Sequence, residues 1–218
     1  MTFGLISSLD RMFPYLKTLF KENNMKKLLV FALFLGLGTS AYAQSPMGGK
    51  LETGLNFFYG MPMDKDMKDS VKASPIYGLF ADYQVVDNVF VGAEYGFGEW
   101  KAKEGDGKMK ENIIGLRAKY ELPIQDGLKV YGLLGIAQYN YKWDGGEKDD
   151  GIGFNLGVGA KYDVAENVFV GLDIRYHFAP KYEQEYREYD EYEDEWYTEK
   201  YSYKTNHMMI GINAGYRF

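Results

Sequence analysis

The chain has 218 residues, no cysteine and a formal net charge of −6 at pH 7. The lack of cysteine excludes a disulfide framework and thiolate-bound metal, and the acidic balance argues against a nucleic-acid partner, which requires a basic surface. No phosphate-binding, dinucleotide-binding or serine-hydrolase motif occurs, so the sequence predicts no enzyme and no cofactor.

The first segment with a clear pattern is 25–43, which is typical of a secretory signal peptide. A methionine and two lysines precede an apolar run at 28–38, and small residues then form an A-x-A cleavage pattern that ends at Ala43. The apolar run is too short to span a membrane as a helix. We expect the mature protein to begin at Gln44, and we interpret 1–24 as an extension from a start codon assigned too far upstream.

Three junctions in the mature chain share one pattern. In each of 81–92, 118–128 and 160–171, an A-x-Y strand end leads through a short turn containing Asn or Gly into a new apolar strand. Asn and Gly tolerate the left-handed backbone that tight hairpin turns need. The junctions therefore predict three short hairpin turns on one side of a sheet.

Alternation of apolar and polar residues predicts eight strands, each long enough to cross a membrane when tilted. The strands are expected at 50–60, 76–85, 89–100, 112–122, 128–143, 151–162, 168–179 and 205–218. Four longer segments connect them on the other side, namely 61–75, 101–111, 144–150 and 180–204. Short turns at one rim and long loops at the other are typical of a transmembrane barrel. The expected fold is an all-β, eight-stranded antiparallel up-and-down transmembrane β-barrel over 44–218, with both ends of the chain in the periplasm.

The last predicted strand shows the alternation most clearly. From 206 to 218, one file of residues is apolar and ends in Tyr216 and Phe218, whereas the other file is small, polar and rich in glycine. A crowded, glycine-rich file fits the lining of a narrow barrel, and the apolar file then faces lipid.

The inward files of the predicted strands hold five acidic and five basic residues. They are Glu52, Asp82, Glu94, Arg117, Lys119, Glu121, Lys161, Asp173, Arg175 and Arg217. Isolated charges in a confined space are costly, whereas paired charges are tolerated. Because the interior of an eight-stranded barrel is just wide enough for its own side chains, we expect a lumen filled by a salt-bridge network.

The orientation of the strand at 128–143 is open, because both of its files are largely apolar. The file that we assign to the outside is Tyr131, Leu133, Ala137, Tyr139 and Tyr141. This choice leaves the polar side chains of Gln138, Asn140 and Lys142 inside the barrel.

Both histidines of the chain, His177 and His207, lie on the inward files of the last two predicted strands. They are expected to face each other if 180–204 folds as a symmetric hairpin. Two histidines with a nearby acid could bind a metal, but two ligands rarely suffice, and the pair could equally be polar lumen residues near the outer mouth. We assign no metal site.

The segment 182–204 has an unusual composition, with nine acidic residues, three basic residues, seven tyrosines and one tryptophan. It is long for a structureless loop and its aromatic residues favour strands, so we expect a protruding hairpin with its tip near Tyr192. The hairpin is either an adhesive or ligand-binding surface or a solvated acidic loop that protects a sheet edge. Acidic residues in 61–75 and 144–150 make the outer mouth negative, which would favour cations in an open pore.

Together these features resemble the small OmpA/OmpX-like outer-membrane barrels of Gram-negative bacteria. The resemblance rests on the signal pattern, the eight alternating strands, the similar turns and the terminal Gly215–Phe218. It implies a monomer in contact with outer-membrane lipid, exported and then recognised by the barrel-assembly machinery through the last strand with Tyr216 and Phe218. It also implies a structural or adhesive surface protein, or alternatively a narrow pore for small solutes. The composition of 180–204 makes this segment the candidate for contact with an extracellular partner, and the acidic loops would make such a pore cation-preferring.

Overall fold

A computed structural model gives the structure of residues 50–144, 148–190 and 195–218. For 184–201 only the backbone is described, with the gap just given. The predicted signal peptide at 25–43, the extension at 1–24 and the hairpin tip near Tyr192 lie outside the described residues, so these three expectations stay predictions.

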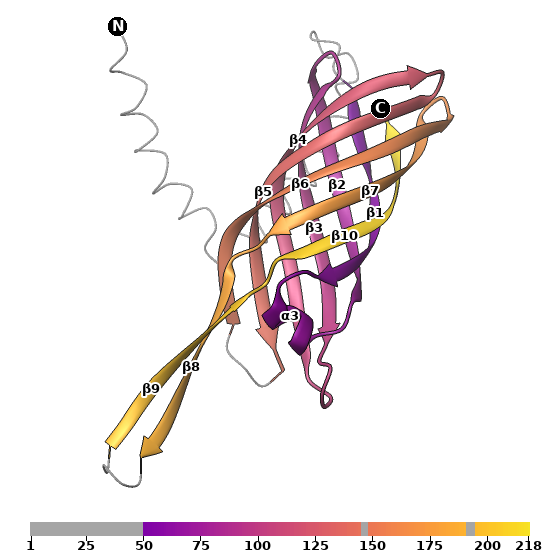
Figure 1. Ribbon diagram of the computed structural model, residues 1–218. Coiled ribbons are helices and arrows are strands. Elements are labelled where there is room, and N and C mark those ends of the chain that lie inside the picture. The colour runs from indigo at the N-terminus through magenta and orange to yellow at the C-terminus, as the bar shows by residue number, and fades with distance from the viewer. Residues whose placement is uncertain (1–49, 145–147, 191–194) are drawn as a thin grey trace, which may run out of the picture. The chain divides into compact units, whose positions relative to one another are not determined.

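Eight strands close into one antiparallel barrel (Figure 1). In order around the barrel they are β1 (Leu51–Pro62), β10 (His207–Arg217), β7 (Val168–Phe178), β6 (Lys148–Ala165), β5 (Leu128–Trp143), β4 (Lys108–Gln125), β3 (Val89–Lys101) and β2 (Ser74–Val86). Because β10 pairs with both β7 and β1, it seals the ring. The predicted eight-stranded antiparallel up-and-down barrel is confirmed. Within the described residues, no helix is long and apolar enough to cross a membrane.

The three short turns share one construction. Two-residue turns join β2 to β3, β4 to β5 and β6 to β7, and a register shift occurs in the last residues of the strand before each turn. Asn88 in the first turn and Gly127 in the second have φ angles of 64° and 76°. These are left-handed conformations that Asn and Gly adopt more readily than other residues, which explains why the junctions carry them.

The opposite rim carries the longer connections. A short helix, α3 (Lys65–Ser70), follows β1, while β8 (Lys181–Asp190) and β9 (Glu195–Lys204) pair as a separate two-stranded sheet. Figure 1 shows β8 leaving from the end of β7 and β9 leading back into β10. The predicted hairpin is therefore present. Two of the predicted loops are shorter than expected, because β4 and β6 both begin earlier than their sequence patterns indicate.

Side chains alternate between an apolar outer surface and a packed interior. The outer file contains large apolar residues with high exposure, such as Leu134 at 60%, Leu172 at 62% and Ile212 at 56%. The glycines of β10 face the interior, where a Cβ added at Gly215 would lie 2.3 Å from a ring carbon of Phe169. The glycine-rich file therefore lines the barrel, as the sequence predicts.

The orientation predicted for β5 is wrong. Its predicted outer file is buried in the interior, namely Tyr131, Leu133, Ala137, Tyr139 and Tyr141. The register with β4 explains the result: the inward-pointing Lys119 lies directly opposite Leu133, and directly opposite residues share one face of a sheet. Leu134 and Ile136 are consequently the exposed residues. The outward file then includes the three polar residues that the sequence analysis placed inside, Gln138, Asn140 and Lys142.

Single-cysteine variants test the orientation of β5 cleanly, because the chain has no native cysteine. A nitroxide spin label at Leu134→Cys should collide frequently with oxygen dissolved in the lipid of a reconstituted vesicle. The same label at Leu133→Cys should be shielded, because Leu133 is 6% exposed. Electron paramagnetic resonance measures both collision rates, and higher oxygen access at Leu133→Cys would restore the sequence-based orientation.

Candidate functional site

The structure gathers all ten charged residues of the predicted lumen network in the barrel interior. Each is at most 9% exposed, and they come from seven of the eight barrel strands. We refer to this set as the ionic layer, which consists of Glu52, Asp82, Glu94, Arg117, Lys119, Glu121, Lys161, Asp173, Arg175 and Arg217. Inward-facing residues converge here because every second side chain of a barrel strand points to the interior.

Glu52 is the centre of the ionic layer at the rim of the short turns. Its carboxylate lies 2.6 Å from Nζ of Lys161 and 2.9 Å from Nζ of Lys119. Arg217 donates to the same carboxylate at 3.0 Å. A second carboxylate contacts the same two lysines: Oε1 of Glu121 lies 2.5 Å from Nζ of Lys161 and 2.8 Å from Nζ of Lys119. Two carboxylates and three bases thus compensate one another in a space that is nearly closed to solvent.

Two arginines form a second centre further along the barrel. Arg117 makes paired hydrogen bonds of 2.7 and 2.8 Å to Asp82, a geometry in which the planar guanidinium matches a carboxylate. Arg117 also contacts Glu94 at 3.2 Å. Arg175 then bonds Glu94 at 2.6 Å and Asp173 at 2.7 Å. Each buried charge of this centre therefore has at least one opposite charge within bonding distance.

The two centres form one network that fills the lumen. Lys119 connects them, because its ammonium contacts Asp82 at 3.1 Å as well as Glu52. Aromatic rings occupy the remaining space, and the guanidinium of Arg117 lies 4.4 Å from the ring centre of Phe80. A cavity in this layer measures about 10 Å³, which is at the lower limit for one water molecule.

Among the described residues, further charged side chains on inward files were absent from the predicted set, including Glu111, Lys129 and Asp163. Asp163 contacts Arg217 at 3.1 Å and Lys129 at 3.2 Å, while Trp100 donates from Nε1 to Glu111 at 2.9 Å. Lys129 was missed because it lies on the misoriented β5. Glu111 and Asp163 each lie one residue beyond a predicted strand end, so extending the alternation by one step would have found them.

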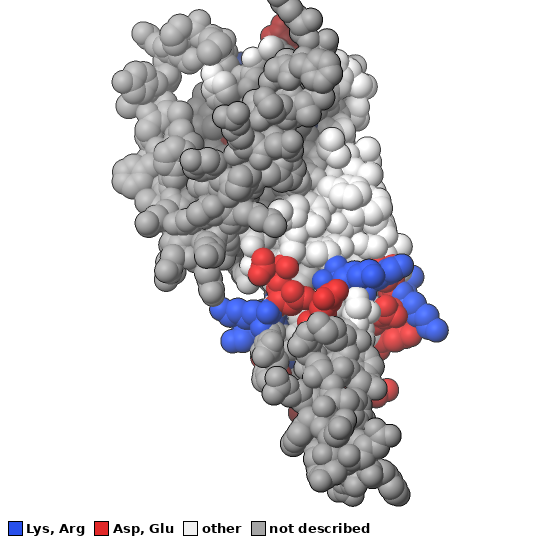
Figure 2. All heavy atoms as spheres, turned by 90° about the vertical axis from the view of Figure 1, so that its left-hand side faces the viewer, with Lys and Arg blue, Asp and Glu red and all other residues white. Residues whose placement is uncertain are grey.

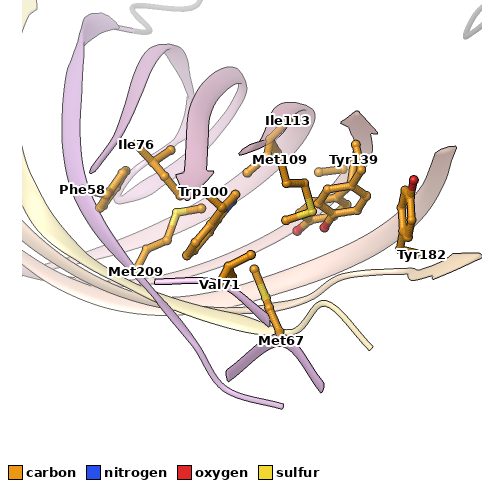
Figure 3. Close-up of a cluster of buried hydrophobic side chains, with 12 residues drawn as sticks. Phe58, Met67, Val71, Ile76, Trp100, Met109, Ile113, Tyr139, Tyr182 and Met209 are labelled. Atoms are coloured by element: carbon orange, nitrogen blue, oxygen red, sulfur yellow. The ribbon is translucent and has the colours of Figure 1, made fainter. Parts of the chain in front are cut away.

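An apolar layer closes the barrel at the rim of the long connections. Its members are Phe58, Met67, Val71, Ile76, Trp100, Met109, Ile113, Ala137, Tyr139, Tyr141, Tyr182 and Met209. Figure 3 shows the labelled side chains from β1, β2, β3, β4 and β10 converging inside the barrel, with Trp100 among them. Trp100 and Tyr139 are completely buried. The interior is thus occupied at two successive levels, first by charge pairs and then by apolar side chains.

The α3 segment supplies part of the apolar layer. Met67 and Val71 are 4% and 1% exposed, and both lie in the connection that the sequence analysis treated as an acidic loop. Backbone hydrogen bonds fix this segment on two sides. Lys72 donates its N–H to the carbonyl of Lys101 on β3, and Met63 donates to the corner between β9 and β10. The first long connection therefore folds over the mouth of the barrel at the rim of the long connections.

His177 and His207 lie directly opposite each other, as the symmetric hairpin predicts. Their rings stack 4.8 Å apart at 15°. Tyr139 contacts Nδ1 of His177 at 2.9 Å, and Nδ1 of His207 donates to the carbonyl of Thr205. Nε2 of His207 is 3.8 Å from Glu111. Because the two rings are nearly parallel, the lone pairs of their ring nitrogens point along parallel lines and do not converge on one position. The described residues contain no group of three or more metal-ligating side chains.

A groove of about 240 Å³ lies between α3 and the base of the β8–β9 hairpin. Its lining includes Met67, Met109, Trp143, Tyr182 and Tyr203, together with two charged residues, Asp66 and Lys204. The volume is below the usual range for small-molecule pockets, so the groove suits a single side chain or a small chemical group.

A comparison with protein families decides what kind of barrel this is. The model of the family described as outer membrane protein beta-barrel domain matches residues 29–218. The chain belongs to this family. As an outer-membrane barrel, it lies in the outer membrane of a Gram-negative bacterium with its apolar outer file against lipid.

Solved structures of other outer-membrane barrels share the fold at low sequence identity. OprG from Pseudomonas aeruginosa is 16% identical with a TM-score of 0.59, and the match covers 78% of this chain and 96% of OprG. Neisserial surface protein A is 17% identical with a TM-score of 0.53, over 78% and 96% of the two chains. A major outer membrane protein from Thermus thermophilus is 12% identical with a TM-score of 0.52, over 78% and 99%. No curated protein matches the chain.

Proposed function

We propose that this outer-membrane barrel is a structural surface protein whose β8–β9 hairpin binds a partner outside the cell. The observation that carries the proposal is an interior filled at two levels, by the ionic layer and by the apolar layer. A filled interior leaves the outer rim as the place for interaction, and outer-membrane barrels direct their longer connections away from the cell.

The hairpin has the composition of a contact surface. Its tyrosines and tryptophan offer large, rigid contact areas at low entropic cost, and the register pairs Tyr189 with Trp196 near the described end of the sheet. Nine acidic residues against three basic ones in 182–204 favour a partner with a positively charged surface. The groove beside Tyr182 and Tyr203 is a place where one side chain of such a partner fits.

Replacing 184–201 by a short glycine-containing turn should abolish binding to host or partner cells and leave the barrel intact. Binding is measured with intact bacteria, and folding is checked by migration on SDS gels with and without heating. The matched control replaces 102–107 with Gly and Ser at equal length, which should leave binding unchanged. If binding is undiminished after this replacement, the proposal is contradicted, and the hairpin is only a solvated acidic loop on a structural barrel.

Surface display of the hairpin is tested separately. A peptide tag inserted next to Tyr192 should be stained by antibody on intact cells, because the topology of the proposal places β8 and β9 outside. Staining only after the outer membrane is breached would invert the topology and contradict the proposal, whatever the binding assay shows.

The alternative function is a narrow, cation-preferring pore for small solutes, which requires both interior layers to move aside. We expect no steady current from the purified protein in a planar bilayer. Deleting 64–71, which removes α3 from the apolar layer, should also produce no current because the ionic layer remains in place. A stable, reproducible open conductance of the unmodified protein would favour the pore.

Recognition of the last strand by the barrel-assembly machinery is the remaining part of the proposal. Tyr216 and Phe218 are 43% and 56% exposed, and their rings contact each other at 4.8 Å. Exposed aromatic side chains at the very end of the sealing strand are accessible to such a receptor.

A further inference from the structure

The groove between α3 and the base of the β8–β9 hairpin has an apolar floor made by two flexible side chains. Met67 of α3 and Met109 of β4 are both buried, and both line the groove. In the view of Figure 3, Met109 lies between Met67 and Tyr182. Methionine side chains are unbranched and polarisable, so they adapt to the shape of a group that packs on them. The floor therefore suits the aliphatic part of a ligand.

Aromatic rings form the walls of this groove. Trp143 lies directly opposite Met109, so it continues the inner face of β5 to the last residue of the strand. Tyr182 and Tyr203 lie directly opposite each other at the base of the hairpin, and directly opposite residues share one face of a sheet. Tyr182 is buried and packs edge-on against Tyr141 at 6.4 Å. Trp143 and Tyr203 are only partly buried, so part of each ring is accessible to a ligand.

One carboxylate lines the groove without a counter-charge. Asp66 on α3 is exposed, and among the described residues its side chain takes part in no ion pair or hydrogen bond. The serine and the threonine of the lining are engaged elsewhere. The hydroxyl of Ser70 donates to the backbone carbonyl of Asp66, and the hydroxyl of Thr205 donates to the carbonyl of Pro180. A cationic ligand would therefore supply the charge partner that Asp66 lacks.

The lysine that lines the groove extends from the other face of the hairpin. Lys204 follows Tyr203 in β9, and successive residues of a strand point to opposite faces. Lys204 lies directly opposite Lys181, so these two basic residues share the face that the tyrosines leave. Figure 2 shows acidic and basic side chains gathered in one belt where the white wall ends, so the overall charge of this rim selects no ligand. The groove itself offers aromatic rings and a carboxylate.

We propose that the groove binds an arginine side chain of the extracellular partner. The inference rests on the proposed function and adds the chemistry of the contact. A guanidinium is planar, so it stacks on rings such as those of Trp143 and Tyr203 while it pairs with the carboxylate of Asp66. The aliphatic stem of the arginine covers the methionine floor. An arginine anchor also agrees with the acidic composition of 182–204, which favours a positively charged partner.

Titration of the full mature protein with a minimal probe tests the proposal. The probe is Nα-acetylarginine amide, and the signals are the methyl resonances of isotope-labelled Met67 and Met109 in detergent micelles. Asp66→Asn should weaken binding about fivefold, the upper end for an exposed ion pair. Tyr203→Leu should weaken it about threefold, because one cation–π contact is lost. The matched control, Asp69→Asn, removes an exposed carboxylate of the same helix that lies outside the groove lining, and should change binding less than about twofold.

Two analogues of the probe identify the group that is bound. Nα-acetylcitrulline amide has the shape of the arginine probe without its charge, and should bind at least about fivefold more weakly. Nα-acetyllysine amide keeps the charge but lacks the plane, and its affinity should lie between the other two. Equal affinities for the arginine and citrulline probes would overturn the proposal, as would equal losses for Asp66→Asn and Asp69→Asn. A lysine probe that binds as tightly as the arginine probe would overturn the assignment to arginine.

Cell-binding assays separate this inference from the proposed function. Replacing 184–201 keeps Asp66, Tyr182 and Tyr203, so it should abolish binding to partner cells and leave the titration with the arginine probe unchanged. Bacteria with Asp66→Asn should lose part of their binding to partner cells, and bacteria with Asp69→Asn should not. If Asp66→Asn weakens probe binding but leaves cell binding unchanged, the groove is not the contact and the inference is overturned, while the hairpin remains the proposed contact. Cell binding that survives the replacement but falls with Asp66→Asn would contradict the hairpin and support the groove.

Discussion

Glu52→Gln is expected to lower the free energy of unfolding by roughly 3–5 kcal/mol. The carboxylate contacts Lys161, Lys119 and Arg217 within 3.0 Å. Removing its charge therefore leaves an uncompensated positive charge among side chains that are at most 9% exposed. Urea unfolding in lipid vesicles, followed by tryptophan fluorescence, measures the loss.

Two further variants separate this effect from a general loss of surface charge. Glu99→Gln removes one partner of an ion pair whose side chains are 38% and 43% exposed, and should cost less than about 1 kcal/mol. Adding Lys161→Met to Glu52→Gln rebalances the interior and should recover part of the loss. Small, equal losses for Glu52→Gln and Glu99→Gln would show a wide, water-filled interior instead of the ionic layer.

Trp100→Ala is expected to destabilise the protein by roughly 3–5 kcal/mol, the range for truncating a large buried aromatic residue. The ring is completely buried, packs edge-on against His207 at 5.5 Å and donates to Glu111. The substitution thus opens a cavity in the apolar layer and removes the donor of a buried carboxylate. The same vesicle-based unfolding measurement applies.

The control for Trp100→Ala lies on the same strand. Phe97 is 46% exposed on the outer wall, and lipid fills the space that Phe97→Ala leaves, so its loss should be much smaller. Trp100→Phe keeps an aromatic ring but removes the N–H donor, and its loss should fall between the two. A loss for Trp100→Ala no larger than that for Phe97→Ala would mean that the apolar layer is loosely packed.

The alternation of side chains explains why so much of the barrel could be predicted. Period two specifies which face is buried, provided that the two files differ. In β10, small and apolar residues separate cleanly between the files, and in β4 the inward charges of Arg117 and Lys119 mark one face. Such contrasts, together with the turn residues, predict the number of strands, the side of the barrel that carries the short turns, and the ten charged residues that point inward.

The segments that the sequence analysis predicted wrongly lack a clear difference between their two faces. In β5 both files are apolar, and the register that places Leu133 opposite Lys119 is a property of the sheet and not of the strand. The six-residue helix α3 is too short for a propensity signal. Its burial depends on Met67 and Val71 meeting residues of distant strands. Polar neighbours of these two residues made the segment resemble an ordinary surface loop.

Glu52 and Arg217 are 165 residues apart in sequence and belong to the first and last barrel strands. Lys119 and Lys161 reach the same carboxylate from β4 and β6, so its full set of partners exists only after β10 has joined β1. Contacts over such separations form late, because loop-closure entropy must be overcome first. The last strand therefore brings in the final counter-charge as it seals the ring, and a partly assembled sheet is penalised electrostatically until that step is complete.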